Sequence, residues 1–352
     1  MTRIALDAMG GDYAPKEVVV GAVEAAVGIP DAKILLVGQL SAIQAELDRL
    51  PKDLKRKSQE AIVKGTLEII HAPEVAEMDE SPVDAIKKKK DCSINVAMRL
   101  VKEGRADAFV SAGNSGAVAA SAQFTLKRIK GVHRPAIATV LPTLDPDRPV
   151  IILDAGANMD CHPEWLVQFA AMGDAYSKAV LRRKVPAVGL LSIGTEDCKG
   201  NEMTKAAFPL LKESKDLNFV GNIEGKDLYK GHIDVAVCDG FVGNVVLKAT
   251  ESIAHALIVR IKQECRRNFF RMLGGLILKV SAFRTLKKQL DPEVYGGAPL
   301  LGVPGAVIIG HGSSSHKAIY YAVKAGVAAA TNDVSGMIAK SIAEYAEDAK
   351  QQ

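Results

Sequence analysis

Short apolar runs alternate with longer segments of helical periodicity along this chain of 352 residues. Apolar runs of strand length that end in Gly, Asp or Asn predict buried strands. Strands are expected at residues 3–7, 33–38, 67–72 and 135–141, and strands that run into turns at 106–118, 149–158, 188–196, 218–225, 234–244 and 306–315. Helices are expected at 16–27, 41–64, 93–103, 117–128, 163–181 and 316–350. This alternation predicts an α/β fold built from parallel β-α-β units.

The composition supports a large aliphatic core and argues against a nucleic-acid partner. Hydrophobic residues make up 48% of the chain and aromatic residues only 5%, as is typical of buried parallel sheets and their helices. The formal net charge of +4 is too small to indicate nucleic-acid binding. Five dispersed cysteines fit free thiols in a reducing compartment, and no signal-peptide pattern precedes the first strand. No uninterrupted apolar segment is long enough to span a bilayer, so a cytoplasmic protein is expected.

A strand, a tight glycine-rich turn and a helix start follow one another at residues 106–118. Gly113 and Gly116 let the backbone turn sharply and approach a ligand, and Asn114 and Ser115 add side-chain donors. Free N–H groups at a helix start favour an anion, so this turn is predicted to cradle an oxyanion or phosphate. An ordinary βα turn with small residues for close packing is the alternative, because the segment matches neither Gly-x-Gly-x-x-Gly nor a P-loop.

A second turn of the same kind ends the last predicted strand. It contains His311, Gly312, Ser313 and Ser314 and leads into the C-terminal helical segment. It is the second candidate oxyanion site, because a strand, polar small residues and a helix start again follow one another. A histidine taken alone is more often a buried hydrogen-bonding residue than a catalyst, whereas the flanking Gly and Ser favour a catalytic interpretation.

Polar side chains recur where the predicted strands end. The group consists of Asp7, Asn114, Asp154, Asn158, Glu196, Asp239 and Asn244. A single Asp or Asn at such a position usually serves the turn itself. Parallel strands place their carboxyl ends along one edge of a sheet, so all seven groups are expected to line one cleft.

Residues 253–290 differ in character from the rest of the chain. Basic residues are interleaved there with apolar ones, and Gly274-Gly275 is predicted to divide the segment into two helices. A short apolar patch flanked by cations is typical of an amphipathic hairpin on an anionic membrane. A helix pair in a dimer interface is the alternative, although interface cores are usually depleted of charge.

Three further features receive structural interpretations. The lysine run at 87–90 is interpreted as a solvated helix face, with contact to an acidic partner as the alternative. The seven histidines lack paired ligand spacing, so neither a metal site nor a cofactor is expected. Cys161 and Cys198 are interpreted as small packing residues.

As an ordered set, the strand-end motifs resemble the phosphate acyltransferase family PlsX, which makes acyl-phosphate for bacterial phospholipid synthesis. The matching segments, which cover nearly the whole chain, are 7–12, 111–117, 154–158, 194–196, 200–202, 204–205, 239–245, 295–298 and 311–314. The resemblance implies a three-layer α/β/α sandwich with a mostly parallel sheet, similar to phosphotransacetylases and to isocitrate and isopropylmalate dehydrogenases. The chain is expected to form one catalytic domain over residues 1–352, with 253–290 as a helical hairpin insertion. Many members carry His where this chain has Tyr13, so Tyr13 is given no catalytic role.

The resemblance also implies a homodimer and a reaction in which inorganic phosphate displaces acyl carrier protein from a fatty acyl thioester. Phosphate is already a nucleophile, so the protein needs to hold the dianion beside the thioester carbonyl and to stabilise the oxyanion. The candidate catalytic residues are His311, Lys205, Asn114 and Ser115. The candidate substrate-binding residues are Asp7, Gly113, Gly116, Asp154, Asn158, Thr195, Glu196, Asp239, Asn244, Gly312, Ser313 and Ser314. Lys205 is assigned to neutralise phosphate, and His311 to donate to the oxyanion or the departing thiolate.

The expected partners are inorganic phosphate, acyl carrier protein, an anionic membrane surface at residues 260–290, a second copy of the chain and a downstream glycerol-3-phosphate acyltransferase. The protein is expected in the cytoplasm, peripherally associated with the inner face of the cell membrane. Three rival functions stay open at this point. They are a short-chain phosphotransacetylase that uses acyl-coenzyme A, a nicotinamide-dependent decarboxylating dehydrogenase, which would need clustered aspartates for a metal, and a non-catalytic membrane scaffold.

Overall fold

The computed structural model describes residues 1–280 and 292–351. The strands are β1 (Thr2–Asp7), β2 (Ala32–Gly38), β3 (Leu67–His71), β4 (Ala108–Ser111), β5 (Ala136–Leu141), β6 (Val150–Leu153), β7 (Ala187–Leu191), β8 (Asn218–Ile223), β9 (Val235–Val237), β10 (Ala298–Leu301) and β11 (Ala306–Ile309). The helices are α1 (Lys16–Gly28), α2 (Leu40–Arg49), α3 (Lys52–Lys64), α4 (Pro82–Lys88), α5 (Ser93–Lys102), α6 (Ser115–Thr125), α7 (Pro163–Ala179), α8 (Glu202–Glu213), α9 (Gly240–Cys265), α10 (Phe269–Val280), α12 (His316–Thr331) and α13 (Val334–Gln351). Two short 3-10 turns, η1 (Asp227–Tyr229) and η2 (Pro292–Tyr295), complete the assignment.

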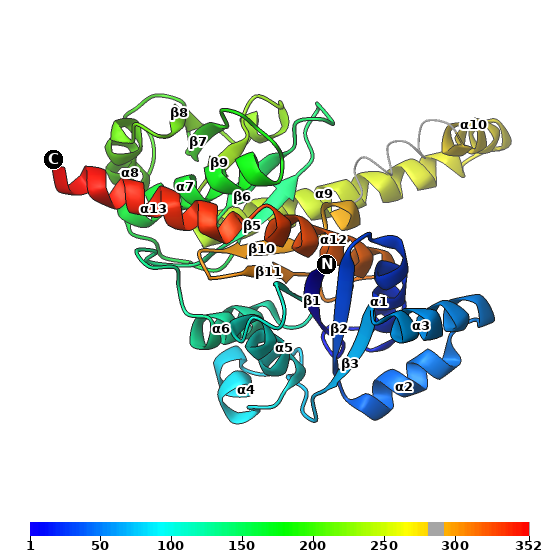
Figure 1. Cartoon of the computed structure of the whole chain (residues 1–352). Helices are drawn as coiled ribbons and strands as arrows, with labels where there is room; N and C mark the ends of the chain where they lie inside the picture. Colours follow the sequence, from blue (N-terminus) through cyan, green and yellow to red (C-terminus); the bar gives the residue numbers. More distant parts are fainter. Residues whose placement is uncertain (281–291, 352) are drawn as a thin grey trace.

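The described strands form one mixed sheet in the order β3-β2-β1-β4-β11-β10-β5-β6-β9-β7-β8. Helices cover both faces of this sheet (Figure 1), which confirms the expected α/β/α layers. Ile4 and Leu6 of β1 pack with α1 and α12 on one face, whereas Ala5 packs with α5 and α6 on the other. Successive side chains of a strand point to opposite faces, so a strand covered on both faces must be apolar throughout.

The strand direction reverses in the middle of the sheet. β3, β2, β1, β4 and β11 are parallel, whereas β10 is antiparallel to both of its neighbours, β11 and β5. β6 is antiparallel to β5, and β9, β7 and β8 continue parallel to β6. The carboxyl ends of β6, β7 and β9 therefore lie at a different edge from those of β1, β4 and β11. The expectation that one sheet edge gathers all seven strand-end groups is wrong, because it assumed a single strand direction.

Two long predicted helical segments are each divided in two. The segment 41–64 breaks at Leu50 and Pro51, because a proline disfavours helical geometry in the residue before it. The C-terminal segment breaks at Asn332 and Asp333, where Asp333 has a φ of 46°. Asp is one of the few side chains that tolerate this left-handed region.

The predicted hairpin at 253–290 also differs in detail. α9 begins at Gly240 and continues to Cys265, and the chain then turns at 266–268 into α10. Gly274 and Gly275 lie inside α10, so they do not divide the two helices. A glycine inside a helix lowers helix stability by only about 1 kcal/mol relative to alanine, so it does not by itself end a helix. Residues 281–290 of the predicted hairpin lie outside the described residues.

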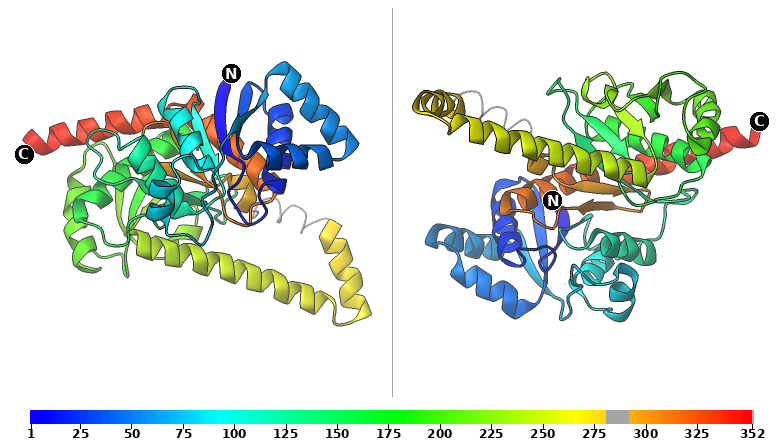
Figure 2. Two further views of the ribbon diagram at one scale, coloured as in Figure 1. Left: turned by 90° about the horizontal axis from the view of Figure 1, so that it is seen from below. Right: turned by 180° about the vertical axis from the view of Figure 1, so that it is seen from behind.

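α9 and α10 extend away from the sheet and its covering helices (Figure 2). Among the described residues, α9 is the one helix whose length and composition would let it cross a membrane, with a mean hydropathy of 1.3 in an 18-residue window that is 6% buried. α9 contains Lys248 and Glu251, so it is not an uninterrupted apolar segment, and the expectation that no such segment is long enough to span a bilayer is not contradicted. Length and composition alone do not place the helix in a bilayer.

Candidate active site

The two glycine-rich turns lie side by side at the carboxyl ends of neighbouring parallel strands. β4 pairs with β11 up to Ser111, which lies opposite Ile309. Gly310 N–H then donates to the Ser111 carbonyl over 2.7 Å, so the two chains leave the sheet together. α6 begins at Ser115 and α12 at His316, each just after its turn. Two helix N-termini therefore lie at the same edge of the sheet, as the oxyanion interpretation requires.

The loop after β1 joins these turns, and together they form the paired-turn site (residues 7–12, 111–116 and 310–315). Asp12 N–H donates to the Gly312 carbonyl over 2.8 Å. A Cβ added to Gly10 would lie 2.6 Å from the Gly113 nitrogen and 2.5 Å from Asp7 Oδ2. No side chain fits in that space, so the first loop can pass the Gly113 turn only if residue 10 is glycine.

A buried carboxylate holds the base of the paired-turn site. Asp7 is 1% exposed, and its Oδ2 accepts a hydrogen bond of 2.6 Å from Ser111 Oγ. Met9 N–H donates to Oδ1 over 3.0 Å, and Gly113 N–H donates to Ser111 Oγ over 3.0 Å. Burial raises the pKa of the Asp7 carboxyl, and the hydrogen bonds from Ser111, Ser93 and the backbone oppose that rise. Asp7 therefore orients Ser111 and the turn backbone.

Asn114 serves the start of α6. Its Oδ1 accepts the Ala117 N–H over 3.1 Å, which makes it the N-cap residue, and its Nδ2 donates to the Met78 carbonyl over 3.0 Å. The predicted side-chain donor of Asn114 is thus directed at Met78. Ser115, one residue further, is exposed and is better placed to donate to a ligand.

His311 is exposed on the second turn, and its contacts select one tautomer. Ser313 N–H donates to His311 Nδ1 over 3.2 Å, and Ser313 Oγ lies 2.8 Å from the same nitrogen. A ring nitrogen that accepts a backbone N–H carries no proton, so the proton of the neutral imidazole is assigned to Nε2. Ser314 Oγ donates to the His311 carbonyl over 2.6 Å and stiffens the turn. Nε2–H is therefore the donor that this turn offers to a substrate.

A second group of predicted residues lies at the carboxyl end of β6. Asp154 is fully buried, and its side chain accepts the Asn158 N–H over 2.6 Å and the Asn158 Nδ2–H over 2.9 Å. Asn158 Nδ2 also donates to the Pro135 carbonyl over 2.8 Å. Burial raises the pKa of the Asp154 carboxyl, and hydrogen bonds from Ala157, Asn158 and the Ile137 backbone oppose it. Asp154 and Asn158 thus shape the loop that follows β6.

Asp239 begins α9 beside this loop. Its Oδ1 accepts the Val242 N–H over 2.9 Å, as an N-cap does. A Cβ added to Gly243 would lie 1.9 Å from the Asp154 carbonyl oxygen, so the first turn of α9 packs directly on the loop. Asn244 is exposed on the next position of the helix.

Thr195, Glu196 and Lys205 form a third, exposed group after β7. Lys205 lies in the first turn of α8, whose N-cap is Asn201. Among the described residues, no hydrogen bond or ion pair joins this group to the paired-turn site. The structure thus brings together Asp7, Gly113 and the 311–314 turn, and it leaves Lys205 in the other half of the sheet.

Three residues of these loops, Ser111, Ser315 and Asn201, had no predicted role. Ser315 and Asn201 are N-caps of α12 and α8, and a Ser or Asn immediately before a helical pattern is a recognisable signal for that role. Ser111 gave no such signal, because its partner Asp7 is 104 positions away.

The five cysteines are free, and Cys198 is exposed, so its interpretation as a packing residue is wrong. Burial raises the pKa of the Cys161 thiol to about 12 and that of Cys238 well above its usual range. A thiol, unlike a thiolate, is a poor nucleophile, which fits packing roles. Within the described ranges, no group of three or more His, Cys, Asp and Glu residues is placed to hold a metal ion.

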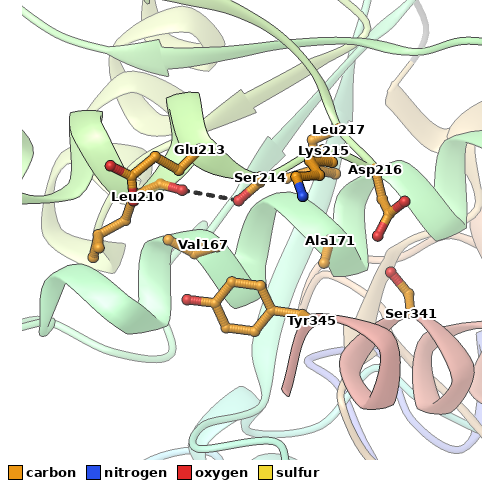
Figure 3. A pocket seen from close by; sticks show the side chains of 10 residues that line it. All are labelled: Val167, Ala171, Leu210, Glu213, Ser214, Lys215, Asp216, Leu217, Ser341 and Tyr345. Carbon is orange, nitrogen blue, oxygen red and sulfur yellow. Dashed lines mark hydrogen bonds between the residues drawn. The ribbon is translucent and has the colours of Figure 1, made fainter. Parts of the chain in front are cut away.

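A pocket of about 140 Å³ lies away from these motifs, between α7, α8 and α13 (Figure 3). Val167 and Ala171 come from α7, Leu210 from α8 and Tyr345 from α13. None of the residues predicted for catalysis or substrate binding lines it, so it is not the candidate site.

Comparison with known sequences points to acyl transfer. A family model described as "Fatty acid synthesis protein" matches residues 2–337. The phosphate acyltransferase of Desulfitobacterium hafniense (strain Y51) is 50% identical over 325 residues, which cover 92% of each chain. The phosphate acyltransferase of Thermosynechococcus vestitus is 47% identical over 96% of this chain and 94% of its own.

Solved structures share the fold at low sequence identity. A phosphotransacetylase from Streptococcus pyogenes has a TM-score of 0.60 at 17% identity, with 94% of each chain covered. The 4-hydroxythreonine-4-phosphate dehydrogenase from Klebsiella pneumoniae has a TM-score of 0.54 at 14% identity, over 94% of this chain and 100% of its own. These likenesses confirm the fold expected from the sequence.

Proposed function

Since the chain belongs to the phosphate acyltransferase family, we propose that it transfers a fatty acyl group from acyl carrier protein to inorganic phosphate. The high sequence identity with phosphate acyltransferases identifies the chain as an acyltransferase with phosphate as a substrate. The carrier-bound fatty acyl donor, and the use of the acyl-phosphate product in phospholipid synthesis, are the further steps of the proposal.

The proposed mechanism depends on the adjacency of the two glycine-rich turns in the paired-turn site. A phosphate oxygen attacks the thioester carbonyl, the C–O bond forms, and the C–S bond breaks as the tetrahedral oxyanion collapses. Backbone N–H groups at the starts of α6 and α12 and the Ser115 hydroxyl would hold the phosphate or the oxyanion. His311 Nε2–H would stabilise the oxyanion or give its proton to the departing thiolate. The backbone cradle would be formed by Gly113, Gly116, Gly312, Ser313 and Ser314.

Lys205 is proposed to neutralise phosphate from the other half of the sheet. It lies in the first turn of α8 and is exposed, as a cation that meets a diffusing dianion must be. Thr195 and Glu196 precede the same helix. Asp154 and Asp239 are proposed to orient this half of the site and not to contact phosphate, because two anions in contact repel each other. Asn158 and Asn244 are uncharged and are proposed to bind substrate.

The exposed apolar surface of α9 and α10 supports membrane and dimer contacts. Phe270 is 83% exposed, and Phe269, Met272 and Leu276 are more than half exposed. Arg267 and Arg271 belong to the same segment and pair with Glu264. We infer that residues 260–290 attach the protein peripherally to the inner face of the cell membrane, and that the same surface also forms contacts in a homodimer. Attachment would deliver the reactive acyl-phosphate to a membrane glycerol-3-phosphate acyltransferase.

The first test is acyl-phosphate formation from a long-chain acyl carrier protein and inorganic phosphate, detected as the hydroxamate. We expect turnover by the wild type, and a loss in kcat of about 10²–10³-fold for His311→Gln, as removal of one oxyanion donor gives. Lys205→Gln should raise KM for phosphate. The exposed Lys52→Gln serves as the control, because it keeps both halves of the site intact.

The same assay separates the rival functions. A short-chain phosphotransacetylase would prefer acetyl- or butyryl-coenzyme A to the long-chain carrier thioester. A scaffold would produce no acyl-phosphate at all, and full activity of the His311 and Lys205 variants would contradict the proposed mechanism.

A further inference from the structure

A basic and aromatic pocket lies at the far end of α6. It has a volume of about 570 Å³ and is lined by Gln123, Phe124, Lys127, Arg128, His133, Arg134 and Trp165. The lining comes from the end of α6, the connection to β5 and the first turn of α7. No residue assigned to catalysis or substrate binding belongs to it.

The lining contains three cations and no carboxylate. Arg134 lies over the Trp165 ring, 5.0 Å from its centroid, and Lys87 Nζ lies 5.4 Å from the centroid of Phe124. Within the described residues, Lys127 and Arg134 have no ion-pair partner. Arg128 donates to the His133 carbonyl, which fixes the rim. Unpaired cations beside aromatic rings, here the exposed Phe124 and the half-buried Trp165, are typical of sites that bind an acidic partner.

Lys127 occupies an unusual backbone position for a lysine. Its φ is 68°, in the left-handed region, two residues after α6 ends. Glycine is the usual residue at such a helix end because it has no Cβ. A lysine there accepts backbone strain and places a cation at the rim of the pocket.

The pocket is connected to both groups of predicted site residues. α6 spans Ser115–Thr125, which is about 15 Å at 1.5 Å per residue, so one helix links the pocket to the paired-turn site. On the other side, Arg134 precedes Pro135, whose carbonyl accepts the Asn158 Nδ2–H over 2.8 Å. A partner held at the pocket can therefore reach the reaction centre with an extended arm.

We propose that this pocket is the docking site for the acidic surface of the acyl carrier protein. The inference rests on the proposed function, which supplies the carrier as donor. The pocket is open, its cations are exposed and Phe124 is 53% exposed, which suits a protein surface. Lys87 and Lys130 extend the positive charge beyond the lining, whereas Lys89 of the 87–90 run is half-buried and pairs with Glu80.

The test is the double charge reversal Lys127→Glu/Arg134→Glu, with Lys52→Glu/Lys184→Glu as a matched control of exposed lysines elsewhere. Three donors with the same acyl chain are compared: acyl carrier protein, acyl-coenzyme A and acyl-pantetheine, which has neither protein nor phosphate. The pocket variant should lose at least tenfold in kcat/KM with the carrier protein, mainly through KM. It should keep its KM for phosphate and its rate with acyl-pantetheine. Its kcat/KM should also depend less on salt, since screening acts on the charges that were removed.

Each other result overturns the proposal. An equal loss with acyl-coenzyme A would assign the pocket to the phosphate of the prosthetic arm, and an equal loss with acyl-pantetheine would assign it to the reaction centre. Unchanged kinetics with the carrier protein would remove any role in docking. If the wild type forms no acyl-phosphate from the carrier thioester, the proposed function fails first, and direct titration with holo-carrier protein still tests the pocket.

Discussion

Ser111 Oγ donates a hydrogen bond of 2.6 Å to Asp7 Oδ2 and joins the ends of β4 and β1 below the paired-turn site. Asp7 is buried, so every donor to its carboxylate lowers the free energy of the charged form. The same hydroxyl accepts the Gly113 N–H, so it also holds the turn that is proposed to bind the oxyanion. This contact therefore links stability to the geometry of the site.

Ser111→Ala should destabilise the fold by about 1–3 kcal/mol, because the Asp7 carboxylate loses a donor. Burial already raises the pKa of Asp7 above its usual value, so the folded state binds this proton more tightly than the unfolded state. Stability is then lost as pH rises above the unfolded pKa. Removing the Ser111 donor raises the folded pKa further, so the defect should be larger at pH 8 than at pH 5. Urea unfolding at both pH values measures it.

The exposed Ser41→Ala is the control for this measurement and should change the free energy of unfolding by less than about 0.5 kcal/mol. A defect of equal size at pH 5 and pH 8 would show that the hydroxyl acts only through packing and not through the charge of Asp7.

Gly10→Ala should disrupt the contact between the first loop and the Gly113 turn. The added Cβ would lie 2.6 Å from the Gly113 nitrogen, so the backbone must move. Overpacking of this kind costs about 1–3 kcal/mol, and we expect acyl-phosphate formation to fall at least tenfold. Gly225→Ala is the control, since a Cβ there meets no atom within 4 Å. Full activity of Gly10→Ala would mean that the loop is not part of the site.

The layers, most strands and the pair of turns were predictable because each depends on a local pattern: an apolar run, a glycine turn and a helix start. The sequence did not show that the polar strand ends lie at two different edges of the sheet. The antiparallel placement of β10 between β11 and β5 causes this, and it is decided by pairing between distant segments. Asn114 and Asp239 were predicted as ligand-facing groups, and the structure shows that they cap α6 and α9. An Asp or Asn before a helix can either cap the helix or face a ligand, and the sequence does not distinguish the two roles.

Asp107→Asn should weaken the fold in a manner that depends on pH. Arg3 Nη2 and Nε donate to the Asp107 carboxylate over 2.6 and 3.1 Å, and the Arg3 N–H donates over 2.7 Å. These hydrogen bonds hold the pKa of Asp107 below its usual value of 3.8. Their stabilisation is present above pH 3.8 and is lost as pH falls through the lower folded pKa.

Because both side chains are about one third exposed, the expected loss for Asp107→Asn is about 1 kcal/mol at pH 7. Chemical denaturation between pH 2.5 and pH 7 should show the variant approach the wild type at the acidic end. A difference that grows on acidification would contradict this assignment.

Leu273, Leu276 and Leu278, which are 49, 58 and 45% exposed, should anchor α10 in an anionic membrane, so replacing all three with Glu should release the protein from anionic liposomes in a flotation assay. Each replacement removes an apolar side chain and adds a charge that the lipid headgroups repel. The control is a triple Glu variant at Val63, Leu144 and Val185, which are 87, 84 and 70% exposed on other parts of the molecule. It should float like the wild type. Light scattering tests whether the same surface forms the dimer interface. A variant that becomes monomeric but still floats would assign α10 to the dimer interface and refute the membrane role.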